Sequence, residues 1–168
     1  MPLSKRWIRR LAVGTAVLLA FLLYVKPSRR FLDVTGPASA ILAEAESWTL
    51  FALDPGIEDP PPKDASIFHG HRVLGKTTLD DPSKRADLTY ALNWAIFRGG
   101  MSVFCFNPRH GIRAETSAGA VDLVICFECE EVHVYLPAAG QPQEVDIAPS
   151  ASVTFNRIFR DAGLAIAR

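Results

Sequence analysis

The sequence lacks the motifs with which many enzymes hold phosphates, metals or nucleophiles. It has no glycine-rich phosphate loop, no Gly-x-Ser-x-Gly elbow and no His-Glu-x-x-His helix. It also lacks an excess of charge, since 18 basic residues balance 18 acidic ones. A nucleic-acid backbone requires a basic face, so nucleic acid is not expected as a partner. No internal repeat is present, which excludes a repeat architecture.

Long apolar runs are also scarce, and the one that stands out lies near the N-terminus, from Leu11 to Val25. It is shorter than the about 20 residues that a straight membrane-spanning helix prefers. Arg10 and Lys26 flank it and can extend their charges to the membrane surface, and Trp7 and Tyr24 lie where interfacial aromatic residues are common. We therefore predict an N-terminal transmembrane helix.

A cleaved signal peptide is the alternative, because a basic segment before a short apolar core fits that pattern too. Lys26, Arg29 and Arg30 follow the core directly, and the small-residue pattern at 38–40 lies well beyond it. These features favour an uncleaved anchor. The slight excess of positive charge before the core places the N-terminus in the cytoplasm. The prediction is a single-pass membrane protein whose C-terminal domain is extracytoplasmic, with the membrane as its partner.

Composition divides the chain into three regions. Residues 1–30 are the basic segment and anchor, 31–46 a short helical connector, and 47–168 one small domain. Within that domain a proline-rich, acidic stretch at 54–64 is predicted to be a loop, because proline cannot donate to a strand ladder.

Two helices are predicted inside the domain. Asp81 and Pro82 are typical of a helix start, and Gly99 of a helix end. A second helix is expected over about 150–162. The remaining segments read as consecutive strands joined by short turns. The predicted fold class is α+β, an antiparallel sheet of about four to five strands with two main helices on one face, preceded by the transmembrane helix.

Cysteine is rare, and all three cysteines lie in one stretch, "CFNPRHGIRAETSAGAVDLVICFEC". Cys105 and His110 form a Cys-x4-His pair, and Cys126 and Cys129 a Cys-x2-Cys pair. Together they make a Cys3His set, which is an accepted ligand complement for zinc. A tight turn near 117–119 places Cys105 opposite a residue around position 130. The four residues are therefore a candidate zinc site.

Other interpretations of the same stretch remain open. In a regular strand Cys126 and Cys129 point to opposite faces, so both reach one ion only if the strand bulges between them. The cysteines are equally consistent with small buried residues, or with one disulfide and one leftover thiol. A thioredoxin-like pair is disfavoured, because the context is a strand with acidic neighbours instead of a helix N-terminus. A Cys105–His110 nucleophile is the weakest reading, because catalytic dyads usually meet only in the fold.

The motifs resemble a family. "FHGHRVLGKTTL", "CFNPRHGIR", "VDLVICFEC" and "FNRIFRDAGL" are similar to a family of small bacterial proteins of unknown function, many of them anchored or exported. The resemblance covers roughly 68–164 and implies no activity. The predicted function is a membrane-anchored, non-enzymatic binding or structural domain of the bacterial envelope. The alternative is a metal-binding or thiol-dependent domain built on the 105–129 hairpin.

Overall fold

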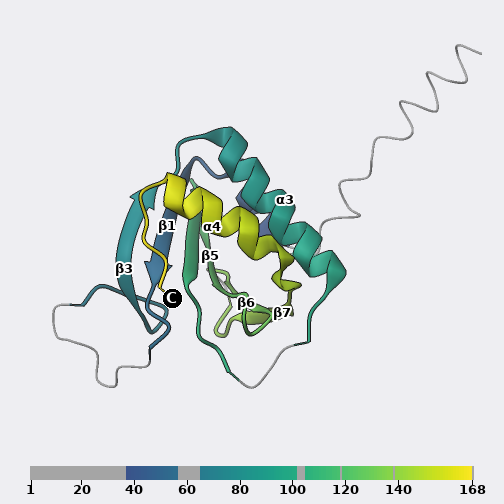
Figure 1. Cartoon of the computed structure of the whole chain (residues 1–168). Helices are drawn as coiled ribbons and strands as arrows, with labels where there is room; N and C mark the ends of the chain where they lie inside the picture. Colours follow the sequence, from purple (N-terminus) through teal and green to yellow (C-terminus); the bar gives the residue numbers. More distant parts are fainter. Residues whose placement is uncertain (1–36, 57–64, 102–104, 118, 138, 168) are drawn as a thin grey trace, which may run out of the picture. The chain divides into compact units, whose positions relative to one another are not determined.

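The computed structural model describes residues 37–56, 65–101, 105–117, 119–137 and 139–167 (Figure 1). In chain order the elements are α2 (Pro37–Glu44), β1 (Ser47–Leu53), β2 (Ile67–Phe68), β3 (His71–Thr78), α3 (Pro82–Arg98), β4 (His110–Thr116), β5 (Gly119–Cys126), β6 (Glu131–Tyr135), β7 (Gln143–Asp146), a 3-10 turn η2 (Pro149–Ala151) and α4 (Ser152–Asp161).

The strands form one sheet in the order β2-β3-β1-β4-β5-β6-β7. Every pair of neighbours is antiparallel. Strands β4 to β7 follow one another as hairpins, whereas β1 is inserted between β3 and β4. The central position of β1 agrees with its sequence, Ser47–Leu53, most of which is buried.

The two faces of the sheet have different coverings. Helices α3 and α4 cross the same face (Figure 1). We call this side the helix face; there Trp48, Leu50 and Ile112 join the apolar residues of the helices in one core. The other side, the open face, has a smaller apolar cluster around Phe51 and Phe68. Because successive strand residues point to opposite faces, the parity of a residue decides which environment it meets.

Several local predictions are confirmed. Helix α3 begins at Pro82 and is capped by Asp81, whose carboxylate accepts from the Ser83 backbone N–H at 2.9 Å. Its C-cap is Gly99, with a φ of 65°. The predicted turn near 117–119 joins β4 to β5. Helix α2, predicted as a connector, packs its Ala38 and Leu42 into the core of the helix face.

The predicted fold class is wrong in its architecture. The sheet has seven strands, not four to five, and the predicted connector helix, α2, packs into the same core as the two main helices. In two places the sequence predicts one strand where the structure has two strands joined by a turn. His69 and Gly70, with φ values of 48° and 85°, separate β2 from β3. The 127–130 turn, which ends in Glu130 at a φ of 57°, separates β5 from β6.

The transmembrane part of that prediction does not gain support from the structure. No helix in the described ranges is both long enough and apolar enough to cross a membrane. The predicted anchor at 11–25 lies outside those ranges, as do residues 57–64 of the predicted loop.

Candidate functional site

A disulfide closes the turn between β5 and β6. Cys126 is the last residue of β5, and its Sγ is bonded to that of Cys129. Both residues are almost fully buried, with exposed fractions of 1% and 0%. In a regular strand Cys126 and Cys129 would point to opposite faces. Here the chain reverses between them, and the turn brings both sulfurs to the same side. The sequence expectation of a strand running through this stretch missed it.

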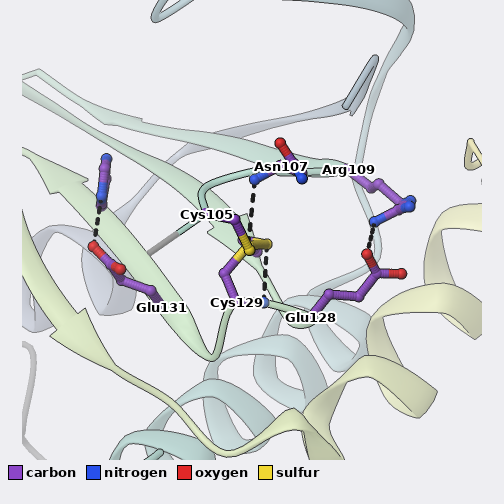
Figure 2. The surroundings of a disulfide bond; sticks show 8 residues. Cys105, Asn107, Arg109, Glu128, Cys129 and Glu131 are labelled. Carbon is purple, nitrogen blue, oxygen red and sulfur yellow. Dashed lines mark hydrogen bonds and ion pairs between the residues drawn. A yellow bond between two sulfur atoms is a disulfide. The ribbon is translucent and has the colours of Figure 1, made fainter. Parts of the chain in front are cut away.

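The third cysteine lies directly against this disulfide (Figure 2). Cys105 carries a free thiol and is exposed. Its Sγ is 3.6 Å from the Sγ of Cys129. All three cysteine sulfurs therefore meet at one point, with the free thiol on the outside and the disulfide within.

Backbone N–H groups point at both disulfide sulfurs. The Asn107 N–H donates to the Sγ of Cys129 at 3.3 Å, and the Cys129 N–H donates to the Sγ of Cys126 at 3.1 Å (Figure 2). Such donors are weak partners of a bonded sulfur but strong partners of a thiolate, because bonds to ionised acceptors are about twice as strong. The site is thus furnished to hold negative charge on sulfur.

The position of Cys105 follows from strand register. Thr116 pairs with Gly119 and His110 with Ile125 across the β4–β5 hairpin. The segment before His110 continues along the same line and therefore runs beside the 126–130 turn. An ion pair between Arg109 Nη1 and Glu128 Oε2, 2.8 Å apart, holds the two segments together (Figure 2).

The structure does not bring His110 to the sulfurs. His110 pairs with Ile125 and shares its helix face, whereas Cys126, one residue on, belongs to the open side with its partner Glu131. His110 Nε2 donates instead to Asn156 Oδ1 of α4 at 2.9 Å. The predicted Cys3His zinc set is therefore not assembled, and two of its sulfurs are bonded to each other.

Burial determines the protonation of His110. It lies among the rings of Phe127, Phe155 and Phe159. Desolvation lowers the pKa of His110 to about 4, and the bond to Asn156 opposes the shift only in part. The imidazole is therefore neutral at physiological pH.

A cavity of about 720 Å³ opens beside His110. Its polar lining includes Arg109, Asn156 and Arg160, and its apolar lining includes Phe127. This volume is within the range of small-molecule sites. Glu128 and Glu130 also line the cavity, and Glu128 is paired with Arg109. The groups that remain to bind a ligand with a carboxylate are the guanidinium of Arg160 and the neutral imidazole of His110.

The other three histidines face the open side. His69 Nε2 donates to Asp122 Oδ2 at 2.7 Å and its ring stacks on Tyr135, and His71 lies edge-on to Phe106. His69 lies in the turn at 69–70 and His71 begins β3, so the two are not members of one strand although both face the open side. Burial lowers the pKa of His71, and the nearby His133 and His69 lower it further.

A different group of residues, which the sequence did not indicate, could hold a metal ion. In the described ranges, the ligand atoms of Glu131, His133 and Glu144 lie within 4.8 Å of one another. The i, i+2 spacing of Glu131 and His133 was a visible signal, but the contribution of Glu144 depends on a strand pairing that spacing does not reveal.

Comparison with protein-family models, curated proteins and solved structures finds no match to this chain. The family resemblance of the motifs therefore stays a prediction, and the functional argument rests on the geometry.

Proposed function

We propose that the protein is a thiol–disulfide exchange domain that works outside the cytoplasm. In this proposal the exposed thiol of Cys105 relays disulfide bonds to and from the buried Cys126–Cys129 pair. The observation that carries it is the 3.6 Å separation between the Sγ atoms of Cys105 and Cys129. Exchange proceeds by attack of a thiolate on a disulfide sulfur, so the attacking and attacked atoms must be neighbours.

The internal step conserves electrons. The Cys105 thiol loses its proton to solvent, and the thiolate attacks the Sγ of Cys129. A Cys105–Cys129 bond forms, the Cys126–Cys129 bond breaks, and Cys126 leaves as a thiolate. That leaving group already accepts the Cys129 N–H at 3.1 Å, which stabilises the charge that it acquires.

Burial makes Cys105 the cysteine of the relay that substrates can reach. External thiols reach the exposed Cys105 but not Cys126 or Cys129. A substrate thiolate attacks Cys105 in the Cys105–Cys129 disulfide, forms a mixed disulfide with Cys105 and releases Cys129 as a thiolate. A second substrate thiolate then releases Cys105. The substrate dithiol is oxidised to a disulfide, and the buried pair becomes two thiols, which a small-molecule disulfide re-oxidises by the reverse route.

The disulfide also bears on the cellular compartment in which the proposed domain would work. A disulfide persists in oxidising surroundings and is rare in the cytoplasm, where thiols are kept reduced. The Cys126–Cys129 bond therefore supports the predicted extracytoplasmic location.

Disulfide mapping of the full chain tests the proposal. The oxidised protein is incubated near neutral pH, quenched with acid and alkylated with N-ethylmaleimide, and its peptides are analysed by mass spectrometry. We expect label on Cys105 and also on Cys126, together with a Cys105–Cys129 linked peptide. In Cys126→Ser, the remaining two cysteines should form a disulfide in air.

The matched control is Cys105→Ser, in which the Cys126–Cys129 bond should remain and no label should appear. Its reduction by glutathione should be slower than that of the unaltered chain by about tenfold or more, because only the buried sulfurs are left to attack. Label confined to Cys105 in the unaltered chain, with two free thiols in Cys126→Ser, would overturn the relay.

A second candidate function is the binding of a small carboxylate, which the cavity beside His110 favours. Among the described residues Arg160 forms no ion pair, so its charge is available to a ligand. Acetate added to the full chain should shift the NMR signals of His110, and Arg160→Gln should weaken that response several-fold. An equal response from sodium chloride at the same ionic strength would remove this candidate.

A further inference from the structure

The hairpin of β6 and β7 brings three metal-ligating side chains together on the open face. His133 pairs directly with Glu144 across the two strands. Glu131 lies two residues before His133 and therefore points to the same face. One ligand atom from each of the three lies within 4.8 Å of the others. The backbone ladder thus sets their spacing before any ligand arrives.

The central imidazole is held in place by its neighbours. The ring of Phe106 stacks on that of His133 at a centroid distance of 3.7 Å and an interplanar angle of 5°. His133 Nε2 is 2.8 Å from Glu131 Oε1, and their side chains are only 17% and 13% exposed. Two of the three groups are therefore largely shielded from water, and the third, Glu144, is exposed on the edge strand β7.

Charge provides an independent argument. Asp146 pairs directly with Glu131, so two carboxylates face each other across the strands. Like charges in this position destabilise a sheet. Within the described ranges, neither Glu144 nor Asp146 forms an ion pair with a lysine or arginine. A bound cation would relieve this repulsion.

We propose that Glu131, His133 and Glu144 form a binding site for a divalent transition-metal ion. One imidazole nitrogen and two carboxylate oxygens suit a borderline ion such as Zn²⁺ or Mn²⁺. Calcium prefers six to eight oxygen ligands, which this set does not supply. Three protein ligands leave coordination positions open to water. The site shares no ligand with the cysteine cluster, so it stands or falls independently of thiol exchange.

Zinc titration by calorimetry tests the site. The full chain carries Cys105→Ser, so that no free thiol competes for the ion, and its disulfide is kept oxidised. We expect one Zn²⁺ per chain and a rise in melting temperature with zinc, since ligand binding to the folded state alone stabilises it. His133→Ala and Glu144→Gln should each raise the Kd by about tenfold or more.

The matched control is Glu115→Gln, which removes an exposed carboxylate from β4 and should leave the affinity unchanged. Glu144 is exposed on an edge strand, so Glu144→Gln should fold normally and keeps the test valid if His133→Ala does not. Binding of less than one equivalent, or equal affinity in Glu144→Gln and Glu115→Gln, would refute the site.

Discussion

At the scale of single residues, the environment of His110 separates it chemically from the sequence motif in which it lies. In "PRHGIR" it lies next to Arg109 and three residues before Arg113. Strand parity buries it on the helix face, where Asn156 Oδ1 accepts a hydrogen bond from its ring and three phenyl rings surround it. The residue is consequently a neutral donor inside the core.

The lowered pKa of His110 predicts acid sensitivity. Its pKa is about 4 in the folded protein and about 6.5 when unfolded, so the unfolded chain binds the extra proton first. The stabilising contribution is complete above pH 6.5 and is lost as the pH falls toward 4. At pH 5 we expect the loss from this group to be about 2 kcal/mol.

Urea unfolding at pH 7.5 and pH 5 measures this loss. His110→Gln is the comparison, because its amide can still donate to Asn156 but does not titrate. The variant should lose less stability between the two pH values than the unaltered chain. An identical loss in both would contradict the assignment.

At the scale of elements, β4 pairs with β1 at a place where glycine alone avoids a close contact, since Gly111 lies opposite Phe51. A Cβ on Gly111 would lie 2.9 Å from Phe68 Cε1 and 3.1 Å from Phe51 Cβ. Those two phenyl rings stack at 4.2 Å and form the apolar cluster of the open face. The glycine of the "PRHGIR" motif therefore has a packing role.

Gly111→Ala should displace the Phe51–Phe68 stack. The free energy of unfolding should fall by about 1–3 kcal/mol, the usual cost of overpacking. Gly140→Ala is the control, since nothing lies within 4 Å of an added Cβ there, and its stability should stay within about 0.5 kcal/mol. Equal stability of the two variants in urea would show that the sheet accommodates the extra methyl group.

Which elements the sequence predicts depends on how local their signals are. Helix α3 is marked at both ends by Asp81 and Gly99, and these signals act within a few residues. The turns at 69–70 and 127–130 carry positive φ values at His69 and Glu130, which no local preference demanded. Because these two turns were not predicted, β2 and β3 were merged, as were β5 and β6, and the predicted sheet had too few strands.

Prediction of the candidate sites from the sequence was limited in the same way. The gathering of Cys105 with Cys126 and Cys129 could be anticipated from the β4–β5 turn and its register. The separation of His110 from these sulfurs could not be anticipated, because it depends on which face of the sheet each residue occupies. Glu144 required the pairing of β6 with β7, which no spacing in the sequence specifies.

At the scale of the whole molecule, we expect the fold to persist without the disulfide. The core of the helix face joins α2, α3 and α4 to the strands, and the Cys126–Cys129 bond closes only one turn. Cross-linking stabilises a protein mainly by restricting the unfolded chain, and a short loop restricts it little. Cycling between oxidised and reduced states is therefore compatible with one folded structure.

Reduction should leave the full chain folded but less stable by about 2 kcal/mol, the value expected for so short a loop. Urea unfolding with and without a phosphine reductant measures the difference. A chain with both Cys126→Ser and Cys129→Ser should show no response to the reductant. Loss of the folded state on reduction would mean that the disulfide organises more than its own turn.

The two borders of the sheet bear on how the protein behaves at high concentration. One border consists of β2, only two residues long, and of the part of β3 beyond Arg72 that β2 leaves uncovered; the other is β7, whose open-face side chains are Glu144 and Asp146. Short and charged edge strands discourage another chain from adding a strand. Charge repulsion at β7 thus protects the sheet from edge-to-edge aggregation, and a metal ion that neutralises Glu144 would weaken that protection.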